Sequence, residues 1–238
     1  MGPASWHKEV MKDMINAGVN VFRVNFSHGD YETHRRTIRL VKELNEEFNC
    51  KTAVLADLQG PKLRIGDVED GAIINEGDVL TFTTNKVRGT AKLVYMNYQQ
   101  FPQDVNAGER ILLDDGKLMC EVLETNKKDT VVTKVIQGGP LKSKKGVNLP
   151  NTKVSLPCLT KKDLEDVVVA MEEGVEWIGL SFVRDAADVQ ELRKVINDFG
   201  SFAKIVSKIE KPEAVVDIDN IIDATDAIMV ARGDLGVE

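Results

Sequence analysis

The chain has 238 residues, of which 42% are hydrophobic and 29% charged, as is typical of a globular protein with one large domain or two smaller ones. The net charge of −7 and the scattered basic residues exclude the massed positive surface of a nucleic-acid-binding protein, and no apolar run is long enough to span a membrane. The first residues lack the pattern of a signal peptide, and Cys50, Cys120 and Cys158 lack the spacing of a zinc site, which predicts free thiols in the cytoplasm.

The first 60 residues alternate between helix and strand patterns. Apolar residues at helical spacing predict a helix that Ser5 caps and Gly18 ends. Residues 19–26 then alternate as in a strand, with Phe22, Val24 and Phe26 on one face and Arg23, Asn25 and Ser27 on the other. A second helix is predicted from about Tyr31 to Phe48, and a buried strand over 52–58.

The pattern changes between residues 62 and 156. Short β-rich runs are separated by turn residues such as Asp114-Asp115-Gly116, and examples of these runs are 79–82, 110–113 and 130–136. This pattern predicts an all-β domain inserted into an α/β domain. The predicted boundaries are 1–60 for the first part of the α/β domain, 61–157 for the insertion and 158–238 for the second part.

Helix and strand patterns alternate again after residue 157. Thr160 to Asp163 has the pattern of a capping box that starts a helix ending at Gly174. A strand over 176–183, a helix to Phe199, another strand, and a helix with Pro212 in its first turn are predicted next. This alternation predicts a parallel sheet and leaves a barrel and an open sheet both open. No G-x-G-x-x-G follows a strand, which disfavours a dinucleotide site.

Polar residues gather near the predicted strand ends. Lys208 and Glu210 are two positions apart in one strand, so their side chains point to the same side, about 7 Å apart along the chain. The next strand, over 227–231, is followed by Asp234. An ammonium and two carboxylates placed in this way predict a site for a divalent metal and an anionic substrate. The alternative, a solvated strand face followed by an ordinary loop, stays open on these residues alone.

Seven segments of the chain resemble pyruvate kinase, and together they span almost its whole length. They are GPAS at 2–5, NVFRVNFSHG at 20–29, DLQGP at 57–61, KKGVNLP at 144–150, LSFVR at 180–184, SKIE at 207–210 and MVARGDLG at 229–236. The resemblance implies an α/β TIM (β/α)₈ barrel, incomplete in this chain, with an all-β domain B inserted after the third barrel strand. It also implies phosphoryl transfer from phosphoenolpyruvate to ADP, which gives pyruvate and ATP in glycolysis.

The resemblance implies roles for individual residues. Lys208 is similar to the lysine that bridges the transferring phosphoryl group, and Arg23 is similar to the arginine that grips it. Glu210 and Asp234 resemble the ligands of Mg²⁺, for which Mn²⁺ is the alternative ion. The other substrate-binding residues of the family are matched in this chain by Ala231, Gly233 and Asp234. Its nucleotide-binding residues are matched by Asn25, His28, Arg64 and Lys145.

The chain departs from the potassium-dependent members of this family near their monovalent-cation site. That site matches Asn25, Ser27, Asp57 and the carbonyl of Leu58. Potassium-dependent members carry Thr-Lys after the aspartate and a glutamate after Gly-Pro, where this chain has Leu58-Gln59 and Lys62. Because the ammonium of Lys62 can take the place of the potassium ion, the departure predicts an enzyme that does not require K⁺.

The resemblance also implies parts that this chain lacks. They are a strand before Gly2, two barrel strands after Glu238, and a C-terminal domain that carries effector binding and much of a homotetramer interface. The chain is then expected to be an N-terminal fragment without activity of its own. Two alternatives stay open: a non-catalytic ligand-binding fragment, and another magnesium-dependent barrel acting on phosphoenolpyruvate or a 2-oxo acid. The Lys145–Asn148 segment of the insertion argues against the second of these.

Overall fold

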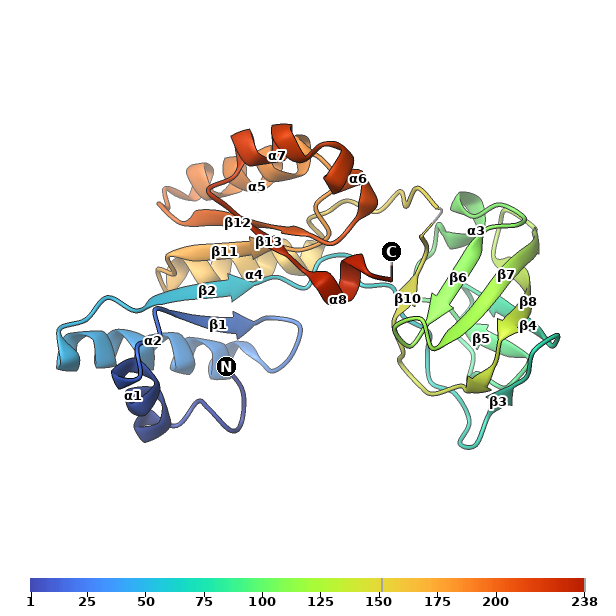
Figure 1. Cartoon of the computed structure of the whole chain (residues 1–238), viewed down its shortest axis with the longest axis horizontal. Coiled ribbons are helices and arrows are strands. Elements are labelled where there is room, and N and C mark those ends of the chain that lie inside the picture. Colours follow the sequence, from blue (N-terminus) through green and yellow to red (C-terminus); the bar gives the residue numbers. More distant parts are fainter. Residues whose placement is uncertain (151, 238) are drawn as a thin grey trace. The chain divides into compact units, whose positions relative to one another are not determined.

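The computed structural model describes residues 1–150 and 152–237, and the chain divides into two compact units (Figure 1). The first unit comprises residues 1–61 and 157–231, and the second comprises residues 62–156 with the last residues from Arg232 onward. Each unit has its own hydrophobic core. Over the residues described, no helix is both long and apolar enough to cross a membrane.

The first unit is built on a parallel sheet. Within the described residues its strands are β1 (Val21–Asn25), β2 (Ala53–Asp57), β11 (Trp177–Leu180), β12 (Lys204–Ile209) and β13 (Ala227–Val230). They lie in the order β1-β2-β11-β12-β13, and every neighbouring pair is parallel. The sheet is curled and its helices lie along its outer side (Figure 1). This is the arrangement of a (β/α)₈ barrel that is incomplete in this chain, which confirms the predicted α/β fold.

The helices of the first unit follow the predicted pattern closely. They are α1 (Lys8–Asn16), α2 (Tyr31–Phe48), α4 (Lys161–Glu172), α5 (Ala186–Phe199), α6 (Pro212–Val216) and α7 (Ile218–Ala224). The predicted bounds of α2 are confirmed, and the side chain of Asp30 caps its first turn by accepting from the Thr33 N–H. The capping box that begins α4 is also confirmed, since Thr160 and Asp163 bond to each other's backbone amides.

Two predicted features of the first unit were wrong. Ser5 does not cap α1, because its hydroxyl bonds to the backbone of Gly2 in a separate turn, and the helix begins later with His7 at the N-cap position. The single helix predicted after Pro212 is two short helices, because Asp217 ends α6 and begins α7 with non-helical backbone angles.

Alternation along β1 determines which side chains face the inside of the curled sheet. Phe22 and Val24 are 1% and 3% exposed, in the core that the strands form with the helices. Burying side chains of this size contributes roughly 1.5–3 kcal/mol each. Because successive side chains of a strand point to opposite faces, this burial directs Arg23 and Asn25 to the other face.

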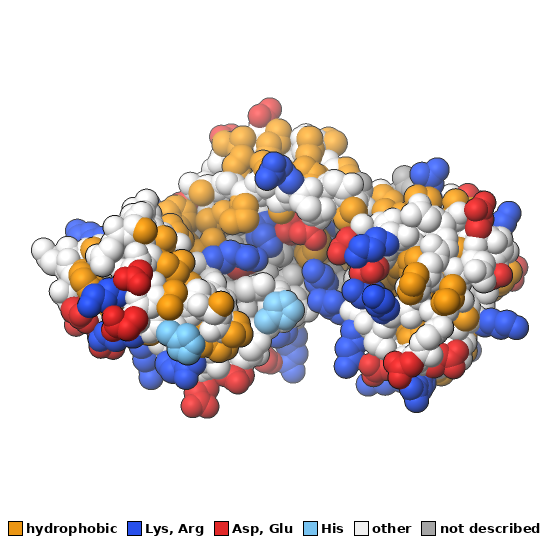
Figure 2. Space-filling view, turned by 60° about the horizontal axis from the view of Figure 1, so that its bottom comes forward, with side chains coloured by type: hydrophobic (Ala, Val, Ile, Leu, Met, Phe, Trp, Pro, Cys, Tyr) orange, Lys and Arg blue, Asp and Glu red, His pale blue; other side chains and the backbone are white. Residues whose placement is uncertain are grey.

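The second unit is rich in antiparallel strands. Its strands are β3 (Ile73–Ile74), β4 (Val79–Thr83), β5 (Leu93–Tyr95), β6 (Arg110–Leu113), β7 (Leu118–Thr125), β8 (Thr130–Gln137), β9 (Gly139–Pro140) and β10 (Val147–Asn148), and its short helices are α3 (Phe101–Asp104) and α8 (Arg232–Leu235). Six of the strands form a sheet in the order β10-β6-β7-β8-β4-β5, and β3 pairs with β9. The three β-rich runs named from the sequence are β4, β6 and β8. Lys, Arg, Asp and Glu side chains are interspersed on the visible face of both units (Figure 2).

Candidate active site

The carboxyl ends of the parallel strands bring polar side chains together in the first unit. Asn25 at the end of β1 pairs in register with Asp57 at the end of β2, and Gly179 of β11 pairs with Asp57 from the other side. Ser181 follows β11 and Glu210 follows β12. Because all these strands run in one direction, their ends lie at the same edge of the sheet, where barrel enzymes build their active sites.

Lys208 lies at the centre of these groups. Its Nζ donates to Ser181 Oγ at 2.8 Å, and it lies 2.9 Å from Glu210 Oε1 and 3.3 Å from Asp57 Oδ1. The predicted common orientation of Lys208 and Glu210 is therefore present. Burial acts to lower the pKa of Lys208, but the attraction of Asp57 and Glu210 outweighs it, and the pKa lies above its ordinary value. The ammonium consequently keeps its positive charge at neutral pH.

Arg23 and Asp57 form an ion pair beside Lys208. The Arg23 Nε donates to Asp57 Oδ2 at 2.6 Å, and its Nη2 contacts the same oxygen. The carboxylate of Asp57 is buried, whereas the side chain of Arg23 is 51% exposed. A guanidinium that is fixed at one side and exposed at the other is suited to bind an anion that arrives from solvent.

Glu210 has the chemistry of a magnesium ligand. It is 1% exposed, and its Oε2 accepts from the Phe182 N–H at 2.7 Å. Carboxylate oxygens are the hard ligands that Mg²⁺ prefers. Among residues 1–150 and 152–237 no three His, Cys, Asp or Glu side chains cluster as a metal site. A magnesium ion that takes one or two protein carboxylates and completes its shell with substrate oxygens and water fits this donor set.

The residues of the predicted monovalent-cation site lie around Asp57. Asn25 Oδ1 accepts from the Ser27 N–H at 2.9 Å, and the carbonyl of Leu58 accepts from Ser181 Oγ at 2.7 Å. Asp57 Oδ1 is the one buried side-chain oxygen or nitrogen without a hydrogen-bond partner in the described part of the chain. The Lys208 ammonium, 3.3 Å away, is the positive charge that lies beside this oxygen.

The structure does not place the other predicted residues in this cluster. Arg64 donates from Nη1 to the Lys144 carbonyl at 2.9 Å, and Lys145 pairs with Asp114 at 2.8 Å, both within the second unit. Lys62 and Asp234 also belong to that unit, Asp234 on α8, and His28 is an exposed residue of the first unit. Their roles stay predictions.

Ala231 and Gly233 are the residues whose backbone is predicted to form a carboxylate cradle. The Ala231 N–H donates to the Ile209 carbonyl at 3.1 Å, which extends the pairing of β12 with β13. Gly233 is the second residue of α8. The role of both residues stays a prediction.

Sequence reasoning gave no role to Ser181 and did not identify Phe182. Ser181 joins Lys208 to Leu58 through its hydroxyl, and Phe182 holds Glu210 through its backbone N–H. The only signal for Ser181 was its position as a polar residue after a buried strand. Phe182 carried none, because a positive φ of 55° at a phenylalanine cannot be read from residue type.

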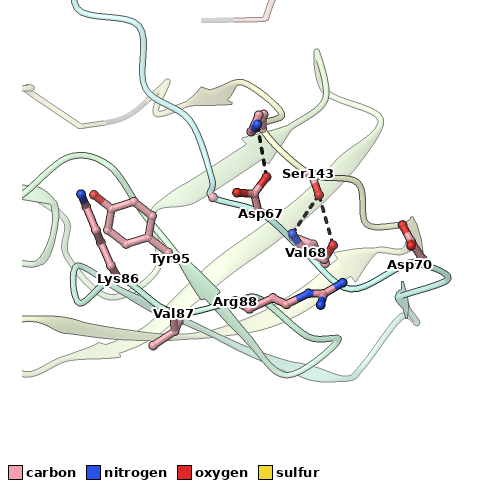
Figure 3. A pocket seen from close by; sticks show the side chains of 10 residues that line it. Asp67, Val68, Asp70, Lys86, Val87, Arg88, Tyr95 and Ser143 are labelled. Carbon is pink, nitrogen blue, oxygen red and sulfur yellow. Dashed lines mark hydrogen bonds and ion pairs between the residues drawn. The ribbon is translucent and has the colours of Figure 1, made fainter.

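The second unit contains a separate hollow of about 830 Å³ (Figure 3). Ser143 braces its wall by hydrogen bonds to both backbone groups of Val68, and Lys144 pairs with Asp67 at 3.4 Å. Lys86, Arg88 and Asp70 also line it. Both positively and negatively charged side chains therefore line the hollow. They favour neither an anionic nor a cationic ligand, and we assign the hollow no ligand.

The comparisons with known proteins agree with one another. The family model described as pyruvate kinase, barrel domain, matches residues 1–238. The chain is 42% identical to pyruvate kinase 2 of Synechocystis, 42% identical to pyruvate kinase of Geobacillus stearothermophilus and 41% identical to pyruvate kinase of Corynebacterium glutamicum. All of this chain is covered in each case, but only 41%, 41% and 50% of the respective relative. The chain thus spans half or less of the length of these relatives.

Proposed function

This chain belongs to the pyruvate kinase family, and from that premise we propose that the whole protein transfers the phosphoryl group of phosphoenolpyruvate to ADP, forming pyruvate and ATP. The observation that supports the proposal most directly is the buried ammonium of Lys208, held by Ser181, Asp57 and Glu210 at the carboxyl ends of the strands. In the reaction, an oxygen of the ADP β-phosphate forms a bond to phosphorus while the bond from phosphorus to the enol oxygen breaks. The enolate that leaves takes a proton on its methylene carbon and becomes pyruvate.

The residues of the first unit have complementary tasks in this proposal. Lys208 places a fixed positive charge where negative charge develops on the transferring group, which is typically the largest single contribution to catalysis. Arg23 binds the phosphate from the exposed side of the site. Glu210 and Asp234 hold Mg²⁺, which would neutralise charge on the phosphoryl oxygens when bound. Arg64, Lys145, Asn25 and His28 are the proposed nucleotide contacts.

The test is an assay of the whole protein with phosphoenolpyruvate, ADP and Mg²⁺, coupled to detection of pyruvate. Lys208→Met should lower kcat by about 10²- to 10³-fold, since it removes the central charge of the site. Lys204→Met is the matched control, because Lys204 lies on the same strand but is exposed, over the ring of Trp177. Pyruvate formation that does not depend on ADP, or a Lys208→Met variant as active as the control, would contradict the proposal.

We further propose that the enzyme does not require K⁺. The support is the lysine at position 62 of the sequence, where the potassium-dependent members of the family carry a glutamate. The ammonium of Lys62 would take the place of the potassium ion. Activity in Na⁺- and K⁺-free buffer should equal activity with K⁺, and Lys62→Glu should create a dependence on K⁺. Strong stimulation of the unmodified protein by K⁺ would refute this.

The chain alone is proposed to bind ligands without turnover, and the whole protein to be a cytoplasmic homotetramer. A thermal melt of this chain with and without Mg²⁺ plus phosphoenolpyruvate tests the binding. A ligand at 100 times its Kd adds roughly 2.7 kcal/mol to the stability of a folded binder. A midpoint temperature that rises only when both ligands are present supports binding. A midpoint temperature that neither ligand changes contradicts it. Light scattering of the whole protein tests the tetramer.

A further inference from the structure

We propose that Ser181 and Phe182 together position the side chains of the candidate active site and anchor both chain segments that connect the two units. This role rests on the proposed function. The two connecting segments are residues 58–61, where the chain leaves the first unit, and residues 157–160, where it returns. All the contacts that carry the inference lie within the first unit.

The hydroxyl of Ser181 links the active-site lysine to the first connecting segment by two hydrogen bonds. Ser181 is 1% exposed, and its Oγ donates to the Leu58 carbonyl at 2.7 Å. A hydroxyl has one proton, so this bond leaves only its lone pairs for the Lys208 ammonium, which donates to them at 2.8 Å. The position of the ammonium and the position of the Leu58 carbonyl are thus fixed by the same oxygen atom.

The backbone of Phe182 holds the carboxylate of Glu210. Strand β11 ends at Leu180, and Phe182 then adopts a left-handed conformation with φ of 55°. This conformation is uncommon for a residue other than glycine and persists only where its surroundings impose it. In this conformation the Phe182 N–H donates to Glu210 Oε2 at 2.7 Å. The strained backbone therefore has an identifiable partner, which is the carboxylate predicted to bind metal.

Both connecting segments contact the same two residues. In the first segment Gly60 has φ of 67°, and a Cβ there would lie 2.9 Å from Phe182 Cδ2 and 3.0 Å from Ser181 Cβ. In the second segment the thiol of Cys158 donates to the Ser181 carbonyl at 3.2 Å. A side chain at position 60 would therefore push against Ser181 and Phe182, and a shift of these two residues would disturb both segments.

The experiment uses the whole protein with Ser181→Ala, and Ser207→Ala as the control. Ser207 is also fully buried, but it precedes Lys208 on β12 and donates instead to Thr225 Oγ at 2.9 Å. Steady-state kinetics give kcat and KM for phosphoenolpyruvate, and hydrogen exchange is followed in peptides that cover the two connecting segments. Ser181→Ala should lower kcat about 100-fold with KM changed less than about 3-fold, because misplacement of a catalytic group costs about this much.

Exchange in both connecting segments should become at least about tenfold faster in Ser181→Ala, as expected when the local bonds that protect them are lost. Ser207→Ala should change neither quantity. If Ser181→Ala does not fold, Ser181→Thr is compared with Ser181→Val, which has nearly the same shape and lacks the hydroxyl. Higher kcat and slower exchange for the threonine variant then support the proposal, and equal values for the pair refute it.

The outcomes separate this inference from the proposed function. If the unmodified protein does not convert phosphoenolpyruvate and ADP, the proposed function fails, and the exchange of the two segments still shows whether Ser181 anchors them. If the protein is active and Ser181→Ala matches Ser207→Ala in kcat and exchange, the inference is overturned. Faster exchange throughout the first unit with unchanged kcat would also overturn it, since it would show a merely structural role.

Discussion

Asp163 offers a sharp test of how the first connecting segment is held. This carboxylate is fully buried in the first turn of α4, where Oδ1 accepts from the Gly60 N–H at 3.0 Å and Oδ2 accepts from the Thr160 N–H at 2.9 Å. Asp163→Ala leaves two backbone donors without a partner, at about 1–3 kcal/mol each. The bond from the Thr160 N–H is also one half of the capping box of this helix, so its loss is already included. We expect a loss of about 4 kcal/mol, which is a large part of the stability of an ordinary domain.

Urea denaturation followed by tryptophan fluorescence measures this loss. Both tryptophans, Trp6 and Trp177, belong to the first unit, so their signal reports the unfolding of that unit. Asp163→Asn keeps one acceptor oxygen and should lose about half as much as the alanine variant. Glu165→Ala is the control, because Glu165 is an exposed residue of the same helix and should change stability by less than about 0.5 kcal/mol. A loss below about 1 kcal/mol for Asp163→Ala would refute the reasoning.

Three further predictions concern single positions. Gly60→Ala should destabilise the first unit by at least about 1–2 kcal/mol in the same urea assay, because its φ of 67° is left-handed and the new methyl group would meet Phe182; an unchanged midpoint would contradict this. Burial and the neighbouring Asp104 raise the pKa of Tyr98 to about 12, above the unfolded value of 10.0, so stability should be full below pH 10 and fall between pH 10 and 12 by roughly 2–3 kcal/mol. Tyr98→Phe should abolish that fall in alkaline denaturation scans of the second unit. Burial raises the pKa of Cys120 to about 11 and that of Cys158 well above its ordinary value, so a thiol reagent at pH 8 should label only Cys50 in the folded chain, and rapid labelling of three thiols would contradict this.

The sequence predicts local features of this molecule well and long-range contacts poorly. The bounds of α2 follow from a capping aspartate and from apolar residues at helical spacing, and the shared side of Lys208 and Glu210 follows from the period of a strand. These signals lie within a few residues of the features they predict. The bond from Asp163 to the Gly60 N–H joins positions 103 apart, and no local pattern indicates it.

The error at Ser5 has the same origin. Ser5 has the right residue type for a helix cap, but its hydroxyl bonds to the backbone of Gly2 instead. Two backbone groups thus compete for one hydroxyl, and residue type alone does not reveal which of them it will bond.

The insertion between β2 and β11 has a consequence for how the chain folds. These strands are neighbours in the sheet, and the Val54 N–H donates to Glu176 Oε2 across 122 positions of the sequence. Closing a flexible loop of this length costs entropy that grows with the logarithm of its length. If the second unit is already compact, only residues 58–61 and 157–176, roughly 25 residues, remain as the loop, which lowers the closure cost by about 1.5 kcal/mol.

The second unit has its own core and pairs its own ends, since the Val147 N–H donates to the Leu63 carbonyl. We therefore expect its amides to become protected first during refolding, before β2 and β11 meet. Pulsed hydrogen exchange during refolding would show this order, and earlier protection of β2 and β11 would contradict it. By folding first, the inserted unit would lower the entropy cost of pairing β2 with β11, the two strands that its sequence separates.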